Sequence, residues 1–202
     1  MNRTRTAILS AAAVMATATP ALAHLDPGEH GSFMAGFSHP LFGADHILAM
    51  VAVGLWAALL AQAAGRRALW LVPSAFVGTM ILGFAAAMLD LPLPFLEPVI
   101  LASVVVIGLL AAIALNAPIV PAMLVVGFFA FFHGYAHGGE IGEAGVWPYA
   151  TGFGIATALL HAAGMAAGLL PGRALGAPNG RLAARIVGAA TALSGIWLAV
   201  AG

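Results

Sequence analysis

The most informative segment of the chain is Ser38-His39-Pro40-Leu41-Phe42-Gly43-Ala44-Asp45-His46-Ile47-Leu48-Ala49-Met50. It places two imidazoles, a carboxylate and a thioether at the start of a long apolar run. Ionisable side chains inside such a run are costly in a bilayer and by default mark a functional site. We therefore expect this segment to enter a membrane as a helix and to bind a ligand there.

Composition places the chain among membrane proteins. Of its 202 residues, 62% are hydrophobic and 7% are charged, against about 25% charged in soluble chains. The length suits a single domain. The net charge is zero and no run of arginines forms a basic patch, which argues against a nucleic-acid partner. Because the chain has no cysteine, any metal must be held by nitrogen, oxygen or thioether ligands.

Residues 1–23 have the pattern of a secretory signal peptide: a positive start, an apolar centre and the cleavage site Ala21-Leu22-Ala23. The alternative is an uncleaved membrane helix, but threonines and Pro20 interrupt the apolar run before it reaches the roughly 20 residues of a span. We expect cleavage. Residues 24–202 then form one transmembrane domain that starts with His24 outside the cytoplasm.

Six apolar segments follow, each close to the length that crosses a bilayer as a helix. They are 38–62, 67–89, 96–115, 118–137, 147–170 and 182–201. The sequence thus predicts an all-α membrane protein with six transmembrane helices. Spans 1–3 and 4–6 enter the membrane from opposite sides, and each triplet carries a histidine motif in its first span. This is the pattern of a 3+3 inverted repeat.

Charge orients these spans. If the chain starts outside and alternates, the arginines between the spans or at their first turns lie on the cytoplasmic side: Arg66, Arg67, Arg173, Arg181 and Arg185. The outer side receives the carboxylates of Asp26, Glu29, Asp90, Glu97, Glu140 and Glu143. This distribution satisfies the positive-inside rule. The predicted location is the bacterial inner membrane, with the mature N-terminus in the periplasm.

The first span is expected to carry a stripe of metal-binding side chains. His39 and His46 are seven residues apart and would share nearly one face of a helix, with Met50 one turn further on. Asp45 would be a ligand or a partner that orients an imidazole. Ser38 is expected to cap this helix, and the proline after His39 to lie in its first turn.

The end of the fourth span carries a second stripe, formed by His133, His137 and Glu140 at i, i+4 and i+7. Both stripes are expected on the order of 10 Å below the outer surface, at 1.5 Å of rise per residue. Imidazole and carboxylate together suit Ni²⁺, Co²⁺, Zn²⁺ or Cu²⁺. Helix–helix hydrogen bonding is the alternative for a single intramembrane histidine, whereas two clusters at one depth favour a metal site.

Five further residues are secondary metal or pathway candidates, because each has an ordinary alternative. Glu97 could be an interfacial anchor, His161 a hydrogen-bonding core residue, and Met50 a packing residue. His24 and His30 lie in a polar tail where histidine is often only solvated. Cleavage before His24 would set a free amine beside its imidazole, which is a possible capture site.

The motifs His39-Pro40-Leu41-Phe42-Gly43-Ala44-Asp45-His46 and Phe132-His133-Gly134-Tyr135-Ala136-His137-Gly138-Gly139-Glu140 resemble those of the HupE/UreJ family. These are hydrogenase and urease accessory membrane proteins regarded as nickel permeases, and the resemblance extends over the whole chain. It implies functional roles for His39, Asp45, His46, His137 and Glu140, with Phe76 and Glu97 matching further positions. It does not select the ion, because some members are associated with cobalt.

These patterns together predict a permease that moves a divalent metal ion from the periplasm to the cytoplasm. Nickel is the first candidate, Co²⁺ and Zn²⁺ are alternatives, and no prosthetic group is expected. A Gly-x4-Gly-Lys-Ser/Thr motif is absent, so the chain is not expected to hydrolyse ATP. One rival is an intramembrane metalloenzyme, although the sequence has neither His-Glu-x-x-His nor Gly-x-Ser-x-Gly. Another is a metal sensor or a stabilising partner that transports nothing.

Overall fold

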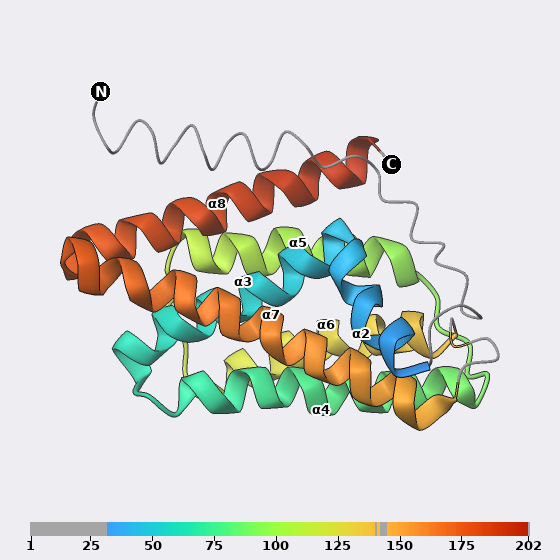
Figure 1. The fold of residues 1–202 in the computed structure, drawn as a ribbon. Helices are drawn as coiled ribbons and strands as arrows, with labels where there is room; N and C mark the ends of the chain where they lie inside the picture. The colour runs from blue at the N-terminus through green and yellow to red at the C-terminus, as the bar shows by residue number, and fades with distance from the viewer. Residues whose placement is uncertain (1–31, 140, 142–144, 202) are drawn as a thin grey trace.

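A computed structural model of the chain describes residues 32–139, 141 and 145–201, and throughout these residues the regular structure is helical (Figure 1). This confirms the all-α class. In chain order the helices are α2 (Ser32–Phe42), α3 (Ala44–Ala64), α4 (Ala68–Met88), α5 (Leu96–Ala112), α6 (Ile119–Gly138), α7 (Val146–Leu175) and α8 (Ala177–Ala201). The predicted signal peptide, His24, His30 and Glu140 lie outside the described residues.

Five of the described helices are long and apolar enough to cross a membrane, namely α3, α4, α6, α7 and α8. Helix α5 is also apolar but has 17 residues. At 1.5 Å of rise per residue it measures about 26 Å, against a hydrocarbon core of about 30 Å. Large apolar side chains such as Trp70, Leu124 and Trp147 point outward from the bundle. So much exposed apolar surface indicates a lipid surrounding, and the chain is a multi-pass membrane protein.

The first predicted span is wrong in one respect, because Gly43 divides it into two helices. Gly43 is extended (φ −82°, ψ 115°), so α2 ends before it and α3 begins after it. Ser38 does not cap a helix start: its hydroxyl donates back within α2 to the carbonyl of Met34, at 2.8 Å. Pro40 lies in the last turn of α2, not in a first turn. His39 and His46 therefore belong to different helices.

A second correction concerns residues 171–181, which the predicted spans 147–170 and 182–201 leave as a connection and most of which are helical. Pro171 lies inside α7, which continues to Leu175. The chain turns instead at Gly176, whose φ of 80° is a left-handed conformation that glycine adopts without a steric penalty. The turn is thus set by a residue that needs positive φ, and not by the proline.

The six helices α3 to α8 form three close pairs in which glycines let two backbones approach. In α3 and α7, Gly54 lies against His161 and Gly168 against Ala58, so these two helices run parallel. Helices α4 and α6 are also parallel, and α5 and α8 are antiparallel, each pair again meeting at glycines. Gly164 and Gly168 on α7 both lie against α3, as small residues are what close helix packing in a membrane requires.

Helix α3 occupies the centre of the bundle and packs against α4, α5, α7 and α8 (Figure 1). Its middle is buried on every side, from Ala52 to Leu60. The indole nitrogen of Trp56 donates to the carbonyl of Leu115 at 3.1 Å, which fixes α3 to the segment after α5. A central helix held in this way positions the side chains at its N-terminal end, where Asp45 and His46 lie.

Candidate functional site

Four imidazoles from three helices meet at one end of the bundle. His39 comes from the last turn of α2, His46 from the first turn of α3, and His133 and His137 from the end of α6. The ring centroid of His137 lies 4.6 Å from that of His39 and 4.5 Å from that of His46. The ring of His46 lies 4.8 Å from that of His133. We call these four residues the histidine cluster.

The cluster unites the two predicted stripes, although by a different route from the one expected. Two members of the stripe on α6, His133 and His137, are one turn apart on the same helix, and its third member, Glu140, lies outside the described residues. On the other side the break at Gly43 separates His39 from His46, yet both rings reach His137. His133 and His137 are almost fully buried, and His46 is nearly so. The cluster is therefore shielded from solvent on the side of α6.

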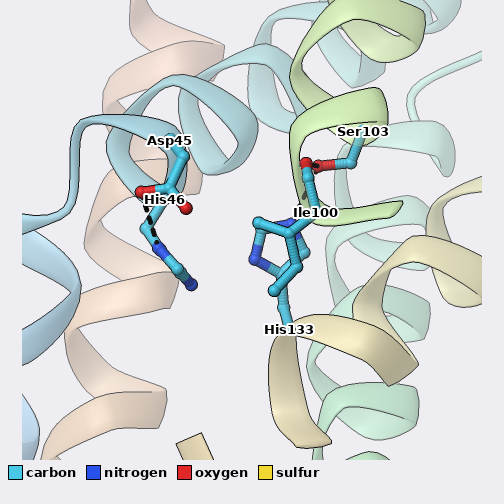
Figure 2. Close-up of polar contacts among 5 residues, drawn as sticks. All are labelled: Asp45, His46, Ile100, Ser103 and His133. Carbon is cyan, nitrogen blue, oxygen red and sulfur yellow. Dashed lines mark hydrogen bonds and ion pairs between the residues drawn. The ribbon is translucent and has the colours of Figure 1, made fainter. Parts of the chain in front are cut away.

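Asp45 fixes the orientation of His46. Its Oδ1 atom lies 3.0 Å from Nδ1 of the imidazole, so that Nδ1 carries the proton donated to the carboxylate (Figure 2). In the neutral imidazole the lone pair is on the other nitrogen, Nε2, which is buried without a hydrogen-bond partner among the described residues. Carboxylate–imidazole pairs of this kind set the tautomer and raise the basicity of metal-binding histidines.

Gly43 makes room for this pair. A methyl group at its Cα would come 2.9 Å from Nδ1 of His46 and 3.0 Å from Oδ1 of Asp45. Both distances are too short for a relaxed contact with the pair. Gly43 thus has two effects at one position. It separates α2 from α3, and it leaves space for the contact between Asp45 and His46 at the start of α3.

Ser103 on α5 performs the same task for His133. Its hydroxyl has one proton, which it donates to the carbonyl of Ile100 at 2.5 Å. It therefore accepts from Nε2 of His133, 2.9 Å away (Figure 2). With the proton on Nε2, the lone pair of His133 is on Nδ1, which is buried and has no hydrogen-bond partner in the described part of the chain. The sequence interpretation did not include Ser103, which lies in an apolar helix with no motif around it.

Aromatic rings enclose the cluster. Phe153, near the start of α7, packs 4.2 Å from the ring of His137, and Tyr149 lies 6.3 Å from that of His39. Phe76 on α4 is 5.8 Å from His133 and fully buried. Phe76 was singled out by family resemblance, whereas Tyr149 and Phe153 were not. Both lie in an apolar helix with no motif around them, so their sequence positions carry no distinguishing signal.

Several predicted candidates are not among the four rings of the cluster. Glu97 is in the first turn of α5 and its side chain is exposed. Met50 is fully buried in the apolar core, which fits the packing alternative. His161 is buried deeper in the bundle, where its ring makes a perpendicular contact with Phe76 at 5.1 Å. Glu140, expected beside His137, is outside the described residues.

The four rings of the histidine cluster lie close together, but they are not arranged to bind one metal ion jointly. The three ring pairs meet edge to face, with interplanar angles of 82°, 87° and 63°. Within the described residues, no group of three or more histidine, aspartate or glutamate side chains is arranged to hold a metal ion. Joint ligation would therefore require the rings to rotate. The lone pairs of His46 and His133 can bind an ion without a change in the hydrogen bonds to Asp45 and Ser103.

Comparisons with known proteins show which sequences are similar to this chain. A family model described as HupE / UreJ protein matches residues 12–198. Protein HupE of Rhizobium leguminosarum bv. viciae is 42% identical to this chain over 188 residues, which is 92% of this chain and 94% of that protein. No solved structure matches the chain.

Proposed function

The chain belongs to the HupE/UreJ family, and from this premise we propose that it is a permease for a divalent metal ion. Nickel is the first candidate cargo, and the ion moves from the periplasm to the cytoplasm. There it serves the maturation of a metalloenzyme, with hydrogenase and urease suggested by the family resemblance. The protein on this proposal is a carrier and not an enzyme, and the ion is its cargo and not a resident cofactor.

The observation that carries the proposal is that two adjacent rings each have a buried nitrogen with an unused lone pair. These nitrogens are Nε2 of His46 and Nδ1 of His133. A buried polar atom without a partner costs about 1–3 kcal/mol, so each one calls for an explanation. Asp45 and Ser103 hold the two rings in the tautomers that keep these lone pairs available. Two neutral imidazole nitrogens are ligands that suit a borderline divalent ion best.

The remaining predicted ligands complete the donor set on this proposal. His39 and His137 supply two more imidazoles within ring contact of the pair. Asp45 and Glu140 would offset the charge of a dication, which is prohibitive in hydrocarbon without such partners. A site of movable imidazoles also suits transport, because binding must stay weak enough for release on the other side.

The helix directions support an entrance on the periplasmic side. Helices α3 and α7 run parallel, and their C-terminal ends carry Arg66, Arg67 and Arg173. Under the positive-inside rule this end is cytoplasmic. The histidine cluster lies at the opposite end, because His46 is in the first turn of α3. The cluster would then face the periplasm, from which the cargo arrives.

The pairing of helices fits six spans arranged as a 3+3 inverted repeat. Counting α3 to α8 as spans one to six, the first pairs in parallel with the fifth and the fourth with the second. An inverted repeat exchanges these two pairs and returns the third–sixth pair to itself. His46 and His133 then come from the corresponding helices of the two halves, the first and fourth spans.

Two measurements on the full chain in vesicles test the proposal. Ni²⁺ is added outside, and a chelating dye inside reports its entry. The proposal predicts a saturable flux that His46→Ala abolishes, whereas Asp90→Asn, an exposed carboxylate change at the same end of the bundle, leaves it intact. Flux equal to that of protein-free vesicles would contradict it. Competition by Co²⁺ or Zn²⁺ then ranks the cargo ions.

The rivals give different results in the same assay. A metal sensor or a stabilising partner binds Ni²⁺ without flux. A metalloenzyme binds iron and turns over a substrate with oxygen. Neither rival has an observation in its favour among the described residues, whereas a permease accounts for polar donors at the mouth of a bundle of apolar helices.

A further inference from the structure

His161 stands out as a buried polar side chain that the cluster does not use. It lies in the middle of α7 with 1% of its surface exposed. Both of its ring nitrogens are buried and lack a hydrogen-bond partner within the described residues. A neutral imidazole has one N–H donor and one lone pair, so both are without a polar partner here. Such a group is rare in a folded protein and calls for an explanation.

The position of His161 places it inward of the histidine cluster. The backbone of His161 lies against Gly54 on the parallel helix α3. Gly54 is eight residues beyond His46, which corresponds to roughly 12 Å along the helix axis. On the orientation argued above, His161 is therefore about 12 Å closer to the cytoplasm at the level of the backbone. A second donor at this depth is what an ion leaving the cluster inward would meet next.

Phe76 connects the two levels. Its ring centroid lies 5.8 Å from that of His133 and 5.1 Å from that of His161, and no part of its side chain is exposed. The contact with His161 is perpendicular, at 83°. An N–H group pointing at the face of a phenyl ring is a weak hydrogen bond. This contact could occupy the N–H of His161, but it leaves the lone pair unused.

Two further side chains with an oxygen or sulfur atom that can bind a metal ion lie beside the path from His133 to His161. Thr157 is one turn before His161 on α7, and Met80 is one turn after Phe76 on α4. Both are buried, and the Thr157 hydroxyl lies 4.0 Å from the Met80 sulfur. A hydroxyl and a thioether are thus added to a region otherwise lined by apolar side chains.

We propose that His161 is an inner binding station for the transported divalent ion, separated from the histidine cluster by the ring of Phe76. The ion would pass from His133 to the lone pair of His161 when the phenyl ring swings aside. This inference rests on the proposed permease function and adds to it a site that neither motif contains.

The decisive variant is His161→Leu, because it separates function from stability. Leucine has nearly the volume of histidine and no polar atoms, so replacing an unpartnered buried imidazole should leave the protein as stable or more stable. If His161 were only a packing residue, inward flux would also be unchanged. The proposal instead predicts that Ni²⁺ flux into vesicles falls by about tenfold or more, while Ni²⁺ binding at the outer cluster changes by less than about twofold. Thermal unfolding of the same preparation shows whether the variant is folded.

A second variant covers the case in which His161→Leu fails to fold. His161→Gln keeps a donor and an acceptor but removes the imidazole nitrogen. A purely hydrogen-bonding role predicts that glutamine restores wild-type flux, whereas the station predicts that flux stays several-fold low. The matched control is Thr191→Val in α8, another buried polar residue, whose hydroxyl bonds only to its own helix. Its flux should equal that of the wild type.

The outcomes distinguish this inference from the proposed function. Wild-type flux of Ni²⁺ with an equal flux in folded His161→Leu would overturn the inner station alone. Absence of flux in the wild type would overturn the permease and the station together. Flux lost in His161→Leu with outer binding kept would support both.

Discussion

The ring of His46 meets the ring of His133 almost at right angles across 4.8 Å, and each ring has one hydrogen-bonded nitrogen and one with no partner among the described residues. On His46 the bonded nitrogen is Nδ1, held by Asp45, and on His133 it is Nε2, held by Ser103. The two supporting residues come from different helices and have different chemistry. They nevertheless produce the same result, because each one selects the tautomer of the neutral ring and leaves the other ring nitrogen buried with its lone pair.

Ser103→Ala should weaken ion binding without unfolding the bundle. The substitution removes the acceptor for the His133 N–H and frees the ring to take the other tautomer. Loss of such a supporting hydrogen bond costs about 10- to 100-fold in metal affinity in known sites. Equilibrium dialysis with Ni²⁺ measures the change. The matched control is Ser194→Ala on α8, a helix that supplies no ring to the cluster, and equal affinities for the two variants would contradict the role given to Ser103.

Asp45→Asn should also weaken binding, by a similar factor of about 10 to 100. The asparagine oxygen can still accept from Nδ1 of His46, but it no longer carries the charge that makes the imidazole more basic or that offsets a dication. Asp90→Asn is the matched control, because Asp90 is exposed and already has a left-handed φ of 52° that asparagine tolerates. Unchanged Ni²⁺ affinity in Asp45→Asn would show that the contact between Asp45 and His46 is only structural.

Gly43→Ala is expected to reduce ion binding with little effect on stability. The backbone of Gly43 has φ −82°, which alanine adopts without strain, so folding should be nearly unaffected. The new methyl group would press on both members of the Asp45–His46 pair, within 3.0 Å of each. Gly78→Ala, where a methyl group meets nothing within 4 Å, is the control. A loss of binding accompanied by an equal loss of thermal stability would mean that the break between α2 and α3 is structural alone.

Gly164→Ala should destabilise the bundle at the contact of α3 and α7. The added methyl group would meet the carbonyl oxygen of Val51, a backbone atom that cannot move aside without shifting the helix. Overpacking of this kind costs about 1–3 kcal/mol. Gly154→Ala on the same helix has open space around it and should be neutral or slightly stabilising, because alanine is the better helix former. Thermal unfolding in detergent compares the two, and equal melting temperatures would contradict the close contact.

The sequence was sufficient to predict the helical class and to predict that the histidines of the two motifs lie close together. The apolar runs are long and uninterrupted, so the helix assignment is robust even where individual ends shift. The positions of His46 and of His133 relative to their spans also placed them at the same depth, because one lies at the start of an outward-starting span and the other near the end of the fourth. Their contact at 4.8 Å agrees with that expectation.

Three features of the site depended on tertiary contacts that no local pattern encodes. The helix break at Gly43 was missed, because a glycine in an apolar run looks like any small packing residue until its neighbours are known. Ser103 was missed, because a single serine in a membrane helix usually bonds to its own backbone, as this one also does to Ile100. Phe153 was missed because it reaches His137 from a different helix.

The most direct test of the central claim is X-ray absorption at the nickel edge of the full chain in bilayers. We predict that bound Ni²⁺ shows scattering from imidazole rings, and that this signal falls in His46→Ala and in His133→Ala when each variant is compared with Asp90→Asn. A nickel spectrum without imidazole scattering, or one that neither histidine variant changes, would contradict the assignment of His46 and His133 as the ion's ligands.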